Sequence, residues 1–258
     1  MIRTIKSGKV VEKSKFWVSE ATRPRAWKHR KMTRRKKDEN ERQATKVLAR
    51  ELNCNCTRGD VLLTLDYAEA PTADEAAKTA RNFIRRLKRA AGQHIRWWLV
   101  TADRNGKTGQ PARVHHHLVI SMGAFRFSDG AWYAGARPLT ELWTAGNYNV
   151  RTLSGQPDYT QVAVYLIRQA RAEENEKKWT CSRNLLQPEV RESVVMQAGP
   201  LRPPAGALLL AEGEYDCERG SHYIRYVPDD RRRTGRGRTD EKEGQDEHQA
   251  DPERRPAG

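Results

Sequence analysis

The sequence predicts an α+β fold in which a central antiparallel β-sheet of about five strands is flanked by helices. Short segments rich in apolar and β-branched residues, typical of strands, are interspersed with longer segments whose apolar residues recur at helical spacing. A turn-rich connection at 104–111 joins two of the short segments directly, which indicates an antiparallel hairpin. At 258 residues, the chain is long enough for one large domain or two small ones, with a sizeable core.

The composition points to a polyanionic partner. The net charge is +15 and the mean hydropathy is −0.90. Residues 1–60 carry 18 Lys/Arg against 7 Asp/Glu, so the basic surplus is mostly N-terminal, as in many proteins that bind nucleic acid. No apolar run approaches the roughly 20 residues of a membrane-spanning helix, and the charged N-terminus does not resemble a signal peptide. With four scattered cysteines expected to be reduced, the sequence predicts a cytoplasmic protein without a membrane partner.

The uneven composition divides the chain into three parts. Residues 1–45 are expected to form a basic arm, residues 46–228 the folded domain, and residues 229–258 a disordered charged tail without large apolar residues. The basic run at 34–37 is either a solvated surface or a contact with a phosphate backbone, which needs only charge and reach. A helix predicted at 41–52 leads from the arm into the domain.

A strand and a helix open the domain. The strand predicted at 61–67 has one face that ends polar, at Thr64 and Asp66, which suits a strand that lines the floor of a site. The helix predicted at 72–91 begins with the capping box Thr72-Ala73-Asp74-Glu75. Its basic side is either a solvated face or a face that contacts DNA.

The strand predicted at 114–121 contains three consecutive histidines and carries the clearest chemical signal. Because side chains alternate along a strand, His115 and His117 share one face, whereas His116 points to the other, otherwise apolar, face. Two imidazoles at i and i+2 on a rigid strand can bind one metal ion. The alternative is a half-buried strand whose histidines bond to neighbours, and three in a row favour the metal hypothesis.

One carboxylate is a candidate third ligand. Asp103 follows the strand predicted at 95–101, which precedes the histidine strand in the hairpin. Carboxylate oxygens commonly join imidazole nitrogens around divalent ions. Asp103 could therefore supply an oxygen ligand, or it could simply be a turn residue.

The remaining elements follow from the same patterns. They are a Gly- and aromatic-rich loop at 122–138, a short helix at 139–143, a strand at 147–153, a helix at 159–177 and a last strand at 222–227. On the long helix, Tyr165 and Arg168 lie at i and i+3 and are neighbours on one face. Taken alone, Tyr165 also fits a boundary tyrosine that packs its ring and exposes its hydroxyl.

These segments together resemble the HUH endonucleases, whose motif is a histidine, a hydrophobic residue and a histidine. More narrowly, they resemble the rolling-circle replication initiators (Rep) of phages and plasmids, the group that includes filamentous-phage replication proteins. The resemblance covers roughly residues 61–188, and the matching segments occur in the family's order: Leu62-Leu63-Thr64-Leu65-Asp66-Tyr67, His115-His116-His117-Leu118-Val119-Ile120, Leu142-Trp143-Thr144-Ala145-Gly146, Val162-Ala163-Val164-Tyr165-Leu166-Ile167-Arg168 and Ser182-Arg183-Asn184-Leu185.

The resemblance implies a sheet-centred nicking domain of the HUH/Rep type. It implies a divalent ion, Mg²⁺ or Mn²⁺, on His115 and His117, with Asp103 as third ligand from a slightly shifted place. Tyr165 would be the nucleophile that nicks single-stranded DNA at a replication origin, leaving a 5′-phosphotyrosine, and so starts rolling-circle replication in a bacterial host cell. Arg168 stands where members of this family often have a lysine. Arginine keeps the positive charge but is a poor proton donor. A host helicase would be a further partner.

Two other classes of function remain open. A conjugative relaxase or a single-strand transposase would share the superfamily's site. Relaxases usually carry a third histidine, which His116 offers in sequence but not by strand parity, and here the tyrosine lies downstream rather than near the N-terminus. The other class is a non-catalytic DNA-binding protein that relies on its basic arm and helix. Metal-dependent nicking of an oligonucleotide separates this class from the enzymes.

Overall fold

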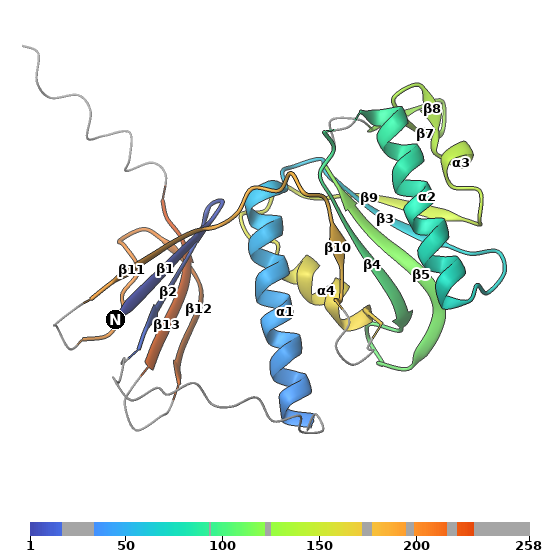
Figure 1. The fold of residues 1–258 in the computed structure, drawn as a ribbon. Coiled ribbons are helices and arrows are strands. Elements are labelled where there is room, and N and C mark those ends of the chain that lie inside the picture. Colours follow the sequence, from blue (N-terminus) through green and yellow to red (C-terminus); the bar gives the residue numbers. More distant parts are fainter. Residues whose placement is uncertain are drawn as a thin grey trace, which may run out of the picture. The chain divides into compact units, whose positions relative to one another are not determined.

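The computed structural model of this protein describes residues 1–16, 34–92, 94–121, 125–171, 177–194, 199–215 and 221–229. Within these residues the chain has an α+β fold of four helices and antiparallel sheets, as the sequence predicts (Figure 1). None of the helices in this part of the chain is long and apolar enough to cross a membrane. The charged tail expected at 229–258 lies outside the described residues, apart from Asp229.

The central sheet has five antiparallel strands with the histidine strand in the middle (Figure 1). The strand order is β10-β4-β5-β3-β9, so β5 is hydrogen-bonded on both sides. This arrangement confirms the expected antiparallel sheet and the hairpin of β4 with β5. The bounds are β3 (Val61–Asp66), β4 (Trp97–Arg104), β5 (Pro111–Ile120), β9 (Tyr148–Thr152) and β10 (Thr180–Cys181).

One face of this sheet packs against α2 (Ala73–Ala91) and α3 (Leu139–Leu142). Helix α2 begins with the expected capping box, in which Glu75 N–H donates to Thr72 Oγ1 and Thr72 N–H donates to the Glu75 carboxylate. The buried core on this side is built from large apolar side chains of the sheet and both helices, among them Leu63, Phe83, Leu87, Leu118, Ile120, Leu142 and Trp143.

Residues 125–138 form two hairpins instead of the expected loop. They are β6 (Phe125–Ser128), β7 (Ala131–Ala134) and β8 (Arg137–Pro138). Asp129 and Gly130 both have positive φ, which closes a two-residue turn whose twist matches that of the strands. The Asp-Gly pair between aromatic residues is thus a hairpin signal that a count of glycines and aromatics does not reveal.

The other face of the central sheet packs against α1 (Arg34–Asn55) and α4 (Thr160–Gln169). Helix α4 is shorter than the helix expected at 159–177. It ends because Ala170 adopts an extended conformation and forms a bridge with Ala102, and because Arg171 N–H donates to the Thr101 carbonyl. The edge of β4 therefore takes over the hydrogen bonds that a longer helix would have made. The core on this side includes Leu48, Leu52, Trp98, Val119, Ala163 and Leu166.

A second five-stranded sheet joins the two ends of the described chain and corrects the expected basic arm. Its order is β11-β1-β2-β13-β12, so residues 2–15 are strands rather than an arm, and α1 begins before residue 45. The sequence of these strands lacks a regular apolar face, because the polar residues Ser7 and Glu12 occupy buried positions. Residues 17–33 lie outside the described part. The bounds are β1 (Ile2–Ser7), β2 (Val10–Lys15), β11 (Glu189–Ser193), β12 (Leu208–Tyr215) and β13 (Ser221–Val227).

A buried ion pair attaches this second sheet to α1. Glu12 on β2 is 5% exposed, and its two carboxylate oxygens accept hydrogen bonds from Arg50 Nε at 2.8 Å and Nη2 at 2.7 Å. The Tyr223 hydroxyl donates a further bond to Glu12 at 3.1 Å. A bidentate pair of this kind fixes both the separation and the orientation of the two elements.

We expect Arg50→Ala to lower the free energy of unfolding by about 2 to 4 kcal/mol, because it leaves the Glu12 carboxylate buried without its charge partner. Urea denaturation followed by circular dichroism measures the loss. The matched control is Arg3→Ala, which removes a half-exposed pair with Glu192 and should cost less than about 1 kcal/mol. Equal losses in the two variants would contradict this role for the buried pair.

Candidate functional site

The pairing of β5 places its three histidines as strand parity predicts. His117 lies opposite Thr64 of β3, and His115 lies opposite Asp66. His116 is fully buried on the other face, where its Nε2 is 2.8 Å from the Tyr67 hydroxyl and its Nδ1 is 3.1 Å from Thr101 Oγ1. Both ring nitrogens of His116 are therefore occupied within the core.

The imidazoles of His115 and His117 meet through their Nε2 atoms, which are 3.2 Å apart. The Nδ1 of His115 is 2.8 Å from the Arg113 carbonyl oxygen. Because a carbonyl can only accept, this Nδ1 carries a proton, and in the neutral form of the ring the His115 Nε2 presents a lone pair. The Nδ1 of His117 is 3.2 Å from Thr64 Oγ1, so it too is engaged away from the pair.

Burial keeps His117 neutral. Removal from water and, to a smaller extent, the positive charge of a protonated His115 lower the pKa of His117 to about 4, although a hydrogen bond with Gln169 acts in the opposite direction. At neutral pH this imidazole is therefore unprotonated and has a lone pair available for a ligand.

The histidine pair fits a divalent ion. Two nitrogens bound to one ion at about 2.1 Å lie about 3 Å apart, close to the observed Nε2 separation. A backbone carbonyl and a hydroxyl hold the two Nδ1 atoms, as outer partners commonly hold metal-binding histidines. Because the Thr64 hydroxyl can donate or accept, His117 can present its Nε2 lone pair to an ion or donate from Nε2 to His115.

Asp103 does not join the histidines in this structure. Its carboxylate oxygens lie 3.8 Å from Arg104 Nε and 3.9 Å from Arg171 Nε. In the register of β4 against β5, Ala102 is the residue opposite His115, and the pairing becomes irregular just beyond it, so Asp103 does not lie across from the histidine pair. Within the described residues, no group of three or more His, Cys, Asp or Glu side chains is arranged to hold a metal.

Asp66 is a second candidate for the oxygen ligand. It lies directly opposite His115 in the register of β3 against β5, and cross-strand partners share a face of the sheet. Its side chain is exposed rather than buried in the core. The sequence indicates that this strand ends polar, but not which residue lies across from His115, since the strands are some fifty residues apart in the chain.

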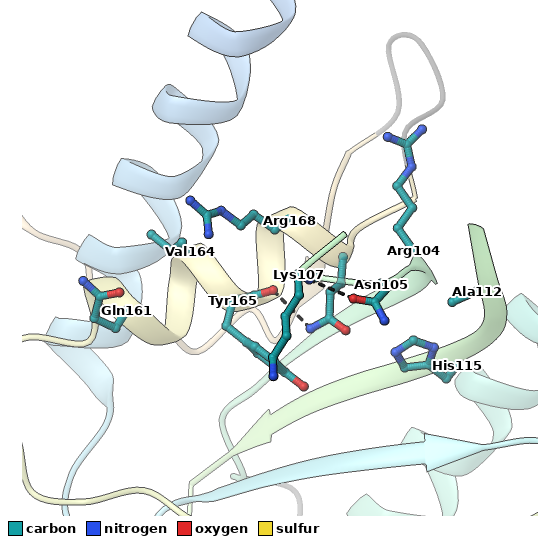
Figure 2. Close-up of a pocket in the computed structure, with 11 residues that line it drawn as sticks. Arg104, Asn105, Lys107, Ala112, His115, Gln161, Val164, Tyr165 and Arg168 are labelled. Carbon is teal, nitrogen blue, oxygen red and sulfur yellow. Dashed lines mark hydrogen bonds between the residues drawn. The ribbon is translucent and has the colours of Figure 1, made fainter. Parts of the chain in front are cut away.

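Helix α4 brings Tyr165 to the histidine pair. The Tyr165 ring centroid is 5.1 Å from that of His117, and 41% of the tyrosine is exposed. Residues from α4, β5 and the β4–β5 loop line an open pocket of about 580 Å³ (Figure 2). We call it the tyrosine pocket, and its lining includes Arg104, Lys107, His115, Tyr165, Arg168 and Gln169.

The Arg168 side chain does not point toward the Tyr165 hydroxyl. Figure 2 shows the Arg168 side chain extending toward α1, whereas the Tyr165 ring extends to the other side of α4. The two residues therefore share a helix and line one pocket, but the guanidinium and the hydroxyl point apart. The predicted electrostatic assistance by Arg168 would require a change of its side-chain conformation.

The β4–β5 loop supplies a cation that the sequence analysis missed. Asn105 Oδ1 accepts the backbone N–H of Lys107 at 2.9 Å, which shapes the turn. A Cβ on Gly106 would lie 2.8 Å from Gln169 Cγ, so glycine allows the loop to approach α4 closely. Gln169 in turn donates to the Tyr165 carbonyl at 3.2 Å. The loop thus rests one turn beyond Tyr165 and places Lys107 on the lining of the tyrosine pocket (Figure 2).

We expect His115→Ala and His117→Ala each to abolish Mn²⁺ binding measured by isothermal titration calorimetry, since each removes half of the nitrogen pair. His116→Ala should keep the affinity but lower the free energy of unfolding by about 2 to 4 kcal/mol, because it leaves a cavity and removes a buried hydrogen-bond partner from the Tyr67 and Thr101 hydroxyls. If His116→Ala stays folded and loses Mn²⁺ binding while the other two variants retain it, the assignment of faces is wrong.

Asp66→Asn and Asp103→Asn distinguish the two candidate carboxylates, because each substitution keeps the side-chain shape and removes the charge. From the strand register we expect Asp66→Asn to weaken Mn²⁺ binding by about tenfold or more, and Asp103→Asn to change it little. The same calorimetric titration applies. The opposite ranking would assign the oxygen ligand to Asp103, as the family resemblance implies.

Comparison of the chain with protein-family models, with curated proteins and with solved structures finds no match.

Proposed function

We propose that this chain is an HUH-type endonuclease, a replication initiator that nicks single-stranded DNA and stays covalently attached to it through Tyr165. One observation carries the proposal. Two imidazole Nε2 atoms 3.2 Å apart on the central strand lie beside a tyrosine ring 5.1 Å away on a separate helix. Metal-assisted attack on a phosphate needs at least a group that holds the metal and an accessible nucleophile, and a pair of imidazole nitrogens next to an exposed hydroxyl can supply both.

The reaction is a transfer of the phosphodiester from a DNA 3′-oxygen to the tyrosine. A divalent ion held by His115 and His117 would supply neutralisation of the charge that develops on the phosphate oxygens. The Tyr165 oxygen attacks phosphorus and loses its proton to water, and the bond to the 3′-oxygen breaks. That oxygen takes the bonding electrons and a proton and leaves as a 3′-hydroxyl. The 5′-phosphotyrosine conserves the bond energy, so a 3′-hydroxyl can later reseal the strand without ATP.

Lys107 is the better candidate for the proton donor to the leaving 3′-oxygen. An ammonium group can act as a proton donor, whereas a guanidinium is a poor one. Lys107 lines the tyrosine pocket from a loop that Gly106 and Gln169 hold against α4. In this proposal Lys107 takes the role that a helix-borne lysine has in related initiators, and Arg168 binds DNA.

The biological setting follows from the resemblance and the charge. The net charge of +15 suits a polyanionic substrate, here single-stranded DNA at the origin of a phage or plasmid that replicates by the rolling-circle mechanism. The chain would act in the cytoplasm of a bacterial host, with a host helicase to separate the strands.

The rival functions make different demands on the site. A relaxase with three histidine ligands would need His116 on the same face as the pair, whereas His116 is buried between Tyr67 and Thr101. A single-strand transposase would use the same groups and differ in its DNA. A purely DNA-binding protein has no need for paired imidazoles beside an exposed tyrosine.

Tyr165→Phe tests the proposed function directly. Incubated with Mn²⁺ and pooled single-stranded oligonucleotides, the wild-type chain should form an adduct that survives denaturing electrophoresis. The phenylalanine variant should fold and bind DNA but form no adduct, because the attacking atom is gone. Tyr159→Phe is the matched control, since Tyr159 is buried at the start of α4, and it should retain the adduct. An adduct with Tyr165→Phe would refute the nucleophile assignment.

Lys107→Arg and Lys107→Ala separate proton donation from charge. If Lys107 donates the proton, both variants should slow adduct formation by about 10²- to 10⁴-fold, measured as single-turnover rates at saturating DNA. If charge alone matters, Lys107→Arg should react at nearly the wild-type rate. Arg168→Ala is the comparison, and a larger loss there than in Lys107→Ala would return the catalytic role to Arg168.

A further inference from the structure

We infer that a second groove, on the far side of α4 from Tyr165, binds backbone phosphates of the DNA strand whose scissile phosphate occupies the tyrosine pocket. This inference rests on the proposed nicking function and extends it. The groove has a volume of about 530 Å³ and lies between α1, α4 and β13. We call it the α1–α4 groove, and its charged lining consists of Asp38, Glu41, Arg42, Lys46, Arg168 and Arg225.

The groove adjoins the tyrosine pocket. Val164 and Arg168 line both of them, so a single turn of α4 separates the two sites. Figure 2 shows Arg168 leaving the helix on the side of α1. A strand that crosses α4 from the histidine pair would therefore meet Arg168 and then the groove. This explains why the Arg168 guanidinium points away from the Tyr165 hydroxyl.

Two of the cations in the groove are held in place by protein contacts. Arg225 donates to Thr160 Oγ1 at 2.9 Å and pairs with Asp158 at 3.4 Å, while its Nε is buried without a hydrogen-bond partner. The Lys46 ammonium lies 5.2 Å from the centre of the Tyr223 ring. A positioned cation loses less conformational freedom when it binds an anion, which favours a specific phosphate contact.

The charge in the groove is graded along α1. Asp38 and Glu41 lie toward the N-terminal end of the helix, and Lys46 is eight residues beyond Asp38, about 12 Å along the axis. The basic end is therefore the one formed by Arg42 and Lys46 with Arg168 and Arg225. Among the residues that the structure describes, none that lines the groove is aromatic, so these side chains offer ion pairs to phosphates rather than surfaces for stacking bases.

The experiment measures binding without nicking. The full chain carrying Tyr165→Phe is titrated with fluorescent oligothymidylate in EDTA, and anisotropy gives the affinity across a range of salt concentrations. Each lost phosphate contact should reduce the slope of log affinity against log salt by about 0.7 for a single strand. Lys46→Gln and Arg42→Gln should each show this reduction, which corresponds to about fivefold weaker binding near 0.1 M salt.

Lys78→Gln is the matched control. It removes one exposed charge from α2, which packs on the opposite face of the central sheet, and it should leave the slope and the affinity unchanged. Thermal melting confirms that the variants are folded. Equal slopes for Lys46→Gln and Lys78→Gln would overturn the inference, whether or not the chain nicks DNA.

A second readout separates this inference from the proposed function. In chains that retain Tyr165, Lys46→Gln should raise the DNA concentration needed for half-maximal adduct formation about fivefold and leave the rate at saturating DNA unchanged. A wild-type chain that forms no adduct would refute nicking, whereas the salt slopes would still report on the groove. A lower rate at saturating DNA would contradict a role limited to binding.

Discussion

The alternation of side chains along a strand that is paired on both sides is the constraint on which the proposed site depends. Because β5 is hydrogen-bonded to β3 and β4, its backbone cannot rotate to change the faces of its residues. His116 is locked into the core by two hydroxyl partners, and this fixes His115 and His117 on the opposite face. The pleat puts both rings on one face, and the contacts of their Nδ1 atoms with the Arg113 carbonyl and the Thr64 hydroxyl orient them so that their Nε2 atoms lie 3.2 Å apart.

The groups around the histidine pair come from distant parts of the chain and meet at α4. The helix carries Tyr165 on one side and Arg168 on the other, and its last residue, Gln169, contacts the loop that bears Lys107. In the proposed function, the chemical step and DNA binding would therefore take place on the two sides of a single helix. The second sheet adds Arg225 at the start of the same helix, through Thr160. If the chain nicks DNA as proposed, this short helix between two pockets would couple the path of the strand to the position of its scissile phosphate.

The parts of the fold that depend on local pattern were predictable, and those that depend on distant contacts were not. Strand parity assigned the faces of the histidines, and the capping box fixed the start of α2. The sequence pattern did not predict the N-terminal hairpin, because Ser7 and Glu12 fill buried positions that usually hold apolar residues. The pairing of Asp66 with His115, and the loop that Gly106 allows to rest on Gln169, follow from register and packing, which one sequence does not contain.

The most direct test of the central claim is to locate the DNA on the protein. The wild-type chain is incubated with Mn²⁺ and pooled single-stranded DNA, the adduct is digested with protease and nuclease, and the peptide that carries a nucleotide is sequenced by mass spectrometry. The site described above predicts a 5′-linked nucleotide on Tyr165. A nucleotide on Tyr159 or Tyr148, or the same adduct in a chain that lacks both His115 and His117, would contradict it.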